Sequence, residues 1–202
     1  MSEELKIYPS ARRNLEVLLA NILVGLIFPI IIFFYLQSAD FSLNILTGLL
    51  LIASFVIGVQ ILVRIAANIA NILNKNPRII FTTTKIEFNL PFIRPFSIPL
   101  SEIEIIYQFI GYAEDGLTFW KREHLVFILK NKSHSHNIRS AKLFDYFLSI
   151  VTPTGGSLIS KQPENDYIAI SNIFYSGTTR EVIKKINAFG FTKTDPFLDY
   201  KQ

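Results

Sequence analysis

The chain contains no cysteine and only three histidines among its 202 residues. Without a thiol it can form no disulfide, zinc–thiolate site or iron–sulfur cluster, and it has no cysteine nucleophile. Charge is also scarce, because 18% of the residues are Asp, Glu, Lys or Arg, against about 25% in ordinary soluble domains. Half of the residues are hydrophobic. This composition excludes a disordered, collagen-like or disulfide-rich chain and leaves a surplus of apolar residues to be placed.

Two long runs near the N-terminus carry no charged residue. Charges stand at Glu16, Asp40 and Arg64, and the runs between them cover residues 17–39 and 41–63. A helix needs about 20 apolar residues to cross a bilayer, and each run is longer than that. A cleaved signal peptide has a shorter apolar region, and residues 77–202 are too few to bury two such helices in a soluble core. We therefore predict a transmembrane helical hairpin whose first helix stays attached.

The positive charges near these runs are distributed asymmetrically. The turn between the runs holds only Asp40, whereas lysine and arginine stand outside both runs, at Lys6, Arg12, Arg13, Arg64, Lys75, Arg78 and Lys85. Loops rich in Lys and Arg stay on the cytoplasmic side of a membrane. The sequence therefore predicts a multi-pass membrane protein with both termini, and all of residues 77–202, in the cytoplasm.

A few polar and small residues lie inside the predicted spans. Asn21 and Gln60 both fall near the cytoplasmic side of an antiparallel hairpin, where their amides can bond each other. Two uncharged amides favour helix pairing over an ion site or polar relay. Ser54 and Gly58 form a small face at which another helix can approach closely, either the partner in the hairpin or one from a second copy.

Residues 64–76 have helical spacing beyond the second span. Ile65, Ile69, Ile72 and Leu73 share one face, and Arg64, Asn68, Asn71 and Lys75 share another. We expect an amphipathic juxtamembrane helix that runs along the headgroup region and stops before Pro77. A solvated linker helix is the alternative.

From Pro77 the apolar pattern changes to short alternating runs rich in Ile, Phe, Thr and Tyr. Such runs predict strands, here at 78–81, 85–90, 93–98, 102–111, 117–120, 124–129 and 167–171. Helical spacing predicts helices at 140–151 and about 179–189, the second with a capping box formed by Thr178 and Glu181. The predicted fold is an α+β membrane protein in which the hairpin of residues 1–76 precedes a small β-barrel or sandwich with C-terminal helices over residues 77–202.

This layout resembles a family of bacterial membrane proteins that carry two N-terminal transmembrane helices followed by a pleckstrin-homology-like (PH-like) cytoplasmic domain. Three segments carry the resemblance: Tyr8-Pro9-Ser10 before the first helix, Asn76-Pro77-Arg78-Ile79-Ile80 opening the sheet, and Ile98-Pro99-Leu100-Ser101-Glu102-Ile103 at a strand and turn. Such domains often have a tryptophan where this chain has Leu100. The resemblance implies a PH-like fold and a bacterial inner-membrane location, and it implies no activity.

Candidate catalytic patterns are sparse. His134 and His136 supply two metal ligands without a third nearby, and a solvated turn explains them better. Glu102 and Glu104 lie on one face of a predicted strand without a matched acid. We therefore expect a protein that is not an enzyme and that has no cofactor or metal site.

One basic segment stands out in residues 77–202. No acid lies between Glu123 and Asp145, and Lys130, Lys132, Arg139 and Lys142 all fall there. Beside an anionic leaflet each such charge contributes about 1 kcal/mol of attraction, so the segment is a candidate site for anionic lipid or for a partner. An ordinary solvated basic face is the alternative. No reader motif for nucleic acid is present, and we expect no nucleic-acid partner.

Three functional classes remain open from the sequence. The first is a non-enzymatic inner-membrane protein whose PH-like domain binds or senses a protein partner or the membrane surface. The second is an immunity protein that neutralises a membrane-active, pore-forming antibacterial toxin, and the third is a membrane-tethered enzyme. The partners implied are the lipid bilayer, a membrane protein or toxin, and a second copy of the chain.

Overall fold

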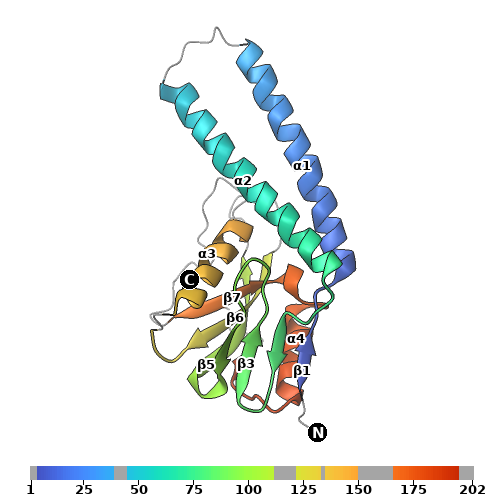
Figure 1. Ribbon diagram of the computed structural model, residues 1–202, viewed down its shortest axis with the longest axis vertical. Coiled ribbons are helices and arrows are strands. Elements are labelled where there is room, and N and C mark those ends of the chain that lie inside the picture. The colour runs from blue at the N-terminus through green and yellow to red at the C-terminus, as the bar shows by residue number, and fades with distance from the viewer. Residues whose placement is uncertain (1–3, 39–44, 112–121, 133–134, 150–165, 196–202) are drawn as a thin grey trace.

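The computed structural model describes residues 4–38, 45–111, 122–132, 135–149 and 166–195. It has the predicted α+β class, with a long helical hairpin joined to a sheet-rich domain (Figure 1). The helices are α1 (Ala11–Ser38), α2 (Ile45–Leu73), α3 (His136–Ser149) and α4 (Thr179–Ala188), with short 3₁₀ turns η1 (Leu100–Glu102) and η3 (Asn172–Phe174). The strands are β1 (Leu5–Ile7), β2 (Ile79–Phe81), β3 (Lys85–Phe88), β4 (Phe96–Pro99), β5 (Ile103–Gly111), β6 (Arg122–Leu129), β7 (Tyr167–Ser171) and β8 (Thr194–Asp195).

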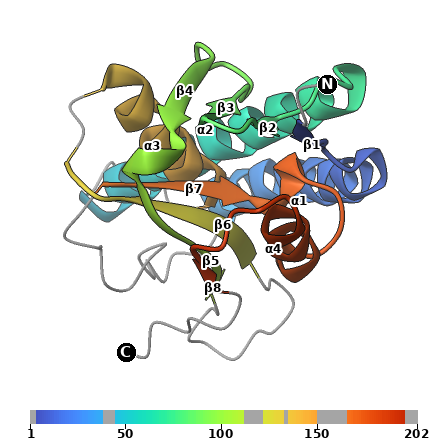
Figure 2. The same ribbon diagram turned by 90° about the horizontal axis from the view of Figure 1, so that it is seen from below.

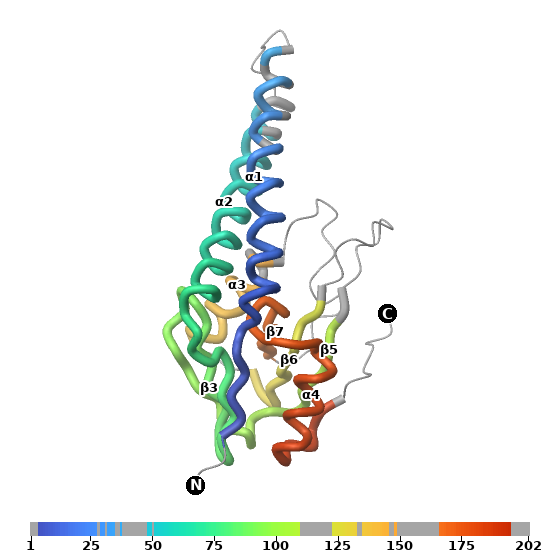
Figure 3. The backbone as a smooth tube through the Cα atoms, turned by 90° about the vertical axis from the view of Figure 1, so that its right-hand side faces the viewer, coloured from blue at the N-terminus to red at the C-terminus, as the bar shows by residue number. Residues whose placement is uncertain are grey.

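The two charge-free runs of the sequence form α1 and α2. These helices have 28 and 29 residues. At a rise of about 1.5 Å per residue, each helix is longer than a hydrocarbon core, which is about 30 Å thick. Both are long and apolar enough to cross a membrane by length and composition. Figure 3 shows them rising together from one end of the domain. Residues 39–44, which include the ends of the two predicted spans, lie outside the described residues.

Two four-stranded sheets make up the rest of the fold. The first has the order β1-β2-β3-β4 and is antiparallel throughout, with Leu5 opposite Phe81 and Phe81 opposite Ile86. The second has the order β7-β6-β5-β8, in which only the short β5–β8 pair is parallel. The predicted strand at 117–120 lies outside the described residues.

The main core lies between the two sheets, and a smaller buried cluster of Tyr107, Val126, Ile128 and Ala169 lies on the other face of the second sheet. Phe81 and Phe88 of the first sheet meet Phe127 of the second, with ring centroids 6.3 and 5.2 Å apart. Helix α4 adds Val182, Ile183 and Ile186 to this core, and α3 adds Ile138, Ala141 and Leu148. Viewed from the end opposite the hairpin, α3 and α4 lie on opposite sides of the sheets (Figure 2).

The capping box predicted at the start of α4 is confirmed. Thr178 accepts from the backbone N–H of Glu181, and the Glu181 side chain accepts from the backbone N–H of Thr178. Strand β7 also has the predicted bounds, Tyr167–Ser171.

The N-terminal strand β1 was not predicted. Residues 5–7 pair with β2, so the sheet draws one strand from the segment that precedes the hairpin. The boundary at residue 77 therefore needs correction, because residues 4–10 belong with the sheet-rich domain. A strand of three residues whose partner lies beyond both long helices leaves no local signal in the sequence.

The polar face of residues 64–73 also differs from its prediction. The sequence pattern placed Asn68 and Asn71 on the polar face of a helix that continues past Arg64 and stops before Pro77. Helix α2 does continue to Leu73, but the two asparagines are 0% and 2% exposed, whereas Leu73 is 77% exposed. Asn71 turns inward to donate to the carbonyl of Ile173, whereas Nδ2 of Asn68 donates to the carbonyl of Arg64 in its own helix.

Candidate functional site

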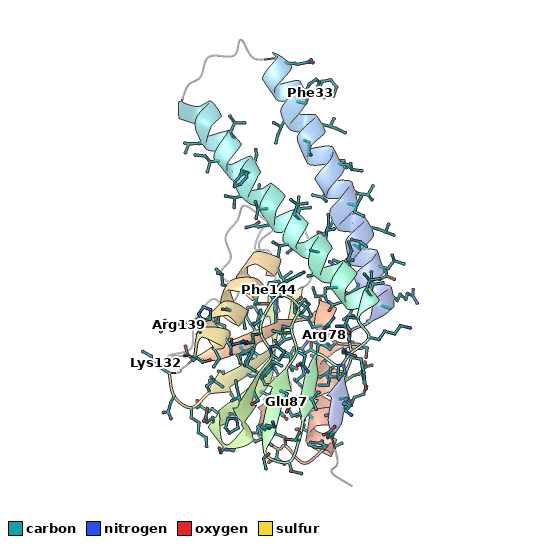
Figure 4. All side chains as sticks on the ribbon, viewed as in Figure 1. Phe33, Arg78, Glu87, Lys132, Arg139 and Phe144 are labelled. Carbon is teal, nitrogen blue, oxygen red and sulfur yellow. The ribbon has the colours of Figure 1, made fainter. Side chains whose placement is uncertain are left out.

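A cluster of polar side chains joins the hairpin to the domain. We call it the polar junction and define it by Arg13, Asn14, Arg64, Asn68, Asn71 and Arg78. The first two lie in the first turn of α1, the next three in the last turns of α2, and Arg78 directly before β2. Asn14, Asn68, Asn71 and Arg78 are buried. Figure 4 shows Arg78 where the lower end of α2 meets the sheets.

Arg78 is the most heavily bonded member of the polar junction. Its Nε donates to Oδ1 of Asn71 at 2.9 Å, and one Nη donates to the carbonyl of Asn89 at 3.3 Å. The other Nη donates to the carbonyls of Ala70 and Asn74, at 3.0 and 3.3 Å. These two carbonyls lie at the C-terminal end of α2, which attracts a cation. Burial lowers the pKa of Arg78, but an arginine stays charged, so the carbonyls must satisfy the guanidinium.

Asn14 and Asn71 connect both helices to η3. The Nδ2 of Asn71 donates to Oδ1 of Asn14 at 3.0 Å and to the carbonyl of Ile173 at 3.3 Å. The Nδ2 of Asn14 donates to the same carbonyl at 2.7 Å and to the carbonyl of Ser10 at 2.8 Å. One carbonyl of the domain thus receives a bond from each helix, which fixes the hairpin relative to the sheets.

Two further arginines extend the polar junction toward its edges. Arg13 donates to the carbonyls of Asn172 and Gly177, at 3.3 and 3.1 Å. Arg64 donates to the carbonyl of Leu148 near the end of α3. In addition, the backbone N–H of Ser176 donates to the carbonyl of Tyr8, ahead of α1, at 2.8 Å. The bonds of Arg13 and Arg64 tie the hairpin to different elements of the domain.

The polar junction holds cations and amides that face carbonyls. Most of its bonds run from a side-chain donor to a fixed backbone oxygen, and two join side chains, Asn71 to Asn14 and Arg78 to Asn71. Such an arrangement fixes orientation and satisfies buried groups. It positions two structural units rather than a proton donor and acceptor around a substrate.

Above the polar junction the hairpin presents apolar side chains outward. Leu23, Leu26, Phe33 and Phe34 of α1 and Phe55 and Leu62 of α2 are all exposed. Only 6% of the apolar stretch in α1 and 22% of that in α2 are buried. Figure 4 shows Phe33 and its neighbours standing away from both helices. An exposed apolar surface of this extent is unusual on a soluble monomer.

The predicted helix-pairing residues are only partly brought together. Asn21 and Gln60 are both buried. The Nδ2 of Asn21, however, has no hydrogen-bond partner among the described residues, so this group does not donate the predicted bond to Gln60. The helices come close at Gly25, where an added Cβ would lie 3.3 Å from Ile61, a position the sequence analysis missed.

Gly58 does not mediate a close approach to the described part of α1 within the hairpin. A Cβ built at Gly58 meets no atom within 4 Å. Packing of a second copy against this face stays a prediction.

The predicted basic segment divides into exposed and paired residues. Lys130, Lys132 and Arg139 are exposed. Figure 4 shows Lys132 and Arg139 on the flank of the domain, away from the hairpin. Lys142 instead pairs with Asp166 at 2.6 Å and lies 4.6 Å from the centre of the Tyr167 ring. Three of the four cations therefore form no ion pair with a described residue, whereas Lys142 is held by Asp166.

One buried titratable pair lies elsewhere in the domain. Nε2 of His124, on β6, is 3.6 Å from Oδ1 of Asp145, on α3, and both residues are buried. Within the described residues, no three His, Cys, Asp or Glu side chains gather as a metal site would require. His134, which the sequence analysis considered with His136 as a pair of metal ligands, lies outside the described residues.

Sequence reasoning missed the polar junction. The available signal was the spacing of Asn68 and Asn71 on one face of a helix, followed by an arginine soon after its end. Comparison with known proteins gives no further guide, because no family model, curated protein or solved structure matches this chain.

Proposed function

We propose that this chain is an integral membrane protein whose hairpin crosses the bacterial inner membrane and holds the sheet-rich domain in a fixed orientation at the cytoplasmic face. The observation that carries the proposal is the outward apolar surface of α1 and α2 above a buried polar junction. Apolar side chains such as Phe33 and Phe55 suit hydrocarbon, in which no water competes for them. The Lys and Arg bias at the domain end of both helices supports the orientation.

We further propose a non-catalytic role for the domain, as a PH-like binding or sensing module for a protein partner or for the membrane surface. The two sheets around one core and the closing helix α4 support this assignment. The hydrogen bonds of Asn14, Asn71 and Arg78 support a domain whose orientation matters, because they prevent free rotation beneath the hairpin.

Reporter fusions test this topology. A phosphatase that works only outside the cytoplasm is fused after residue 40 in one strain and after residue 202 in another. We expect activity from the fusion at residue 40 and none from the fusion at residue 202, with comparable amounts of both proteins on immunoblots. Activity from the C-terminal fusion contradicts the proposal.

A further inference from the structure

The domain exposes two large apolar side chains near α2. Among the described residues that follow α2, Phe92 and Leu143 are the exposed large hydrophobic residues, at 69% and 58%. Phe92 lies between β3 and β4, and Leu143 lies on α3. The ring of Phe92 meets that of Phe144, the chain neighbour of Leu143, with centroids 6.1 Å apart. Figure 4 shows Phe144 directly below α2, and α3, which carries Leu143, contacts α2.

The backbone holds Phe92 outward. Its φ is 62°, the positive-φ conformation that among the described residues is otherwise adopted only by glycines. Leu90 and Pro91 on one side are buried, and Ile93 on the other packs against the core. A bulky residue in this conformation is strained, and such strain persists where the surrounding structure enforces it, commonly at functional positions.

The exposed apolar face of α2 continues down to the domain. Leu62, Ile69 and Leu73 share one face of the helix and are 65%, 41% and 77% exposed. This face extends past residue 63, where the charge-free run ends. Figures 1 and 3 show the loop between β3 and β4 on the same side of the molecule as the lower half of α2. Arg78 donates to the carbonyls of both Ala70 and Asn89, so the loop that carries Phe92 begins beside the lower end of α2.

We infer that Leu73, Phe92 and Leu143 form a membrane-contact edge that inserts into the boundary between headgroups and acyl chains of the cytoplasmic leaflet. The inference rests on the proposed membrane hairpin and assigns this edge of the domain to lipid. Continuity with the hairpin surface favours lipid over a protein as the occupant. Exposed cations follow two of these residues in the chain, Lys75 two positions after Leu73 and Arg94 two positions after Phe92, which suits anionic headgroups. Lys132 of the basic segment lies on another flank of the domain, whereas Arg139 precedes Leu143 by one turn of α3.

Site-specific fluorescence tests the edge, since the absence of native cysteine allows a single labelled position in each variant. Phe92→Cys, Leu143→Cys, Phe33→Cys and Thr83→Cys are each labelled with a polarity-sensitive dye in the full chain, reconstituted in vesicles of phosphatidylcholine and phosphatidylglycerol. Phe33 reports the span, and Thr83, exposed in the turn between β2 and β3, reports water. Quenching is measured with iodide in the water and with nitroxides at shallow and deep positions on the lipid.

The expected pattern differs among the four positions. Residue 33 is quenched by the deep nitroxide, residues 92 and 143 by the shallow nitroxide with little iodide quenching, and residue 83 by iodide alone. If the nitroxides quench residue 33 while iodide alone quenches residues 92 and 143, the inference of a membrane-contact edge is wrong, and the proposed membrane-spanning hairpin is retained. Iodide quenching at residue 33 overturns the proposed function itself. Shielding of residues 92 and 143 from iodide without lipid quenching would assign the edge to protein contacts and overturn the inference.

Discussion

The hairpin and the sheet-rich domain place the same residue type in opposite positions. Phe81, Phe88 and Phe127 in the domain are all 0% exposed, whereas Phe33 and Phe55 in the hairpin are 58% and 73% exposed. A domain surrounded by water buries its aromatic side chains because burial removes apolar area from water. A helix pair that turns them outward is matched to a surrounding of hydrocarbon. On the proposed membrane placement, the contrast teaches that one chain is built for two solvents.

Polar side chains show the reverse arrangement at the boundary between these regions. Asn14, Asn68, Asn71 and Arg78 turn inward at the foot of the hairpin and bond to carbonyls. The outward side of α2 at the same level carries Leu73. Burial at the polar junction therefore follows hydrogen bonding rather than hydrophobicity.

The largest expected effect comes from the core of the domain. Phe127→Ala removes a fully buried ring that contacts Phe81 and Phe88, so we expect the free energy of unfolding to fall by about 3–5 kcal/mol. The matched variant Phe55→Ala truncates a ring in the hairpin and should cost far less. Thermal unfolding of the full chain in micelles, followed by circular dichroism, measures both. Equal losses would break the comparison between the two regions.

A smaller loss is expected at the polar junction. Arg78→Ala removes the guanidinium donor from Oδ1 of Asn71 and from the carbonyls of Asn74 and Asn89, and we expect a loss of about 2–3 kcal/mol. Arg12→Ala is the control, because Arg12 is exposed and, among the described residues, its ion pair is with Glu16 on its own helix. The same unfolding measurement applies. A loss at Arg78 no larger than that at Arg12 would show that the junction does not stabilise the protein.

The asparagines should contribute less than the arginine, and jointly. Asn14→Ala removes the bonds to Ser10 and Ile173 and should lower the free energy of unfolding by about 1–2 kcal/mol. Because Asn71 donates to Asn14, adding Asn71→Ala should cost less than the sum of the single changes. Additive losses would mean that the two helices are held separately. Asn76→Ala, at an exposed position, is the control.

The features that the sequence predicts correctly are local ones. The two long helices, the capping box at Thr178 and the bounds of β7 follow from charge-free length, local hydrogen-bonding chemistry and alternation, which are local properties of the sequence. Strand β1 and the inward turn of Asn71 depend on partners far along the chain, at β2 and at Ile173. A rule that places polar residues outside fails where a distant carbonyl supplies the bond.

Buried polar groups in the domain predict a pH dependence. Burial raises the pKa of Tyr175, whose hydroxyl bonds to Thr179. A raised folded pKa means that the stability from the neutral phenol is fully present below about pH 10 and is lost as the pH rises further. We expect a loss of about 1 kcal/mol per pH unit above that value, measured by chemical unfolding. Tyr175→Phe should remove this part of the alkaline slope, and an unchanged slope would contradict it.

The smallest effect separates the members of the basic segment. Lys142→Ala breaks a half-buried pair with Asp166 and should cost about 0.5 kcal/mol, whereas Lys130→Ala, at an exposed position, should leave stability unchanged. Unfolding curves in low and high salt distinguish them, because screening weakens only the pair. Indistinguishable curves for the two variants would show that the pair between Lys142 and Asp166 does not contribute to stability.

Extraction of membranes with alkaline carbonate tests the two-solvent account most directly. Membranes from cells that produce the full chain are washed with carbonate, which releases proteins held by surface contacts, and known peripheral and integral proteins serve as markers. The account predicts that the chain stays in the pellet with the integral marker and dissolves only in detergent, because hydrocarbon surrounds the apolar surface of α1 and α2. Release of the folded chain with the peripheral marker would contradict the account.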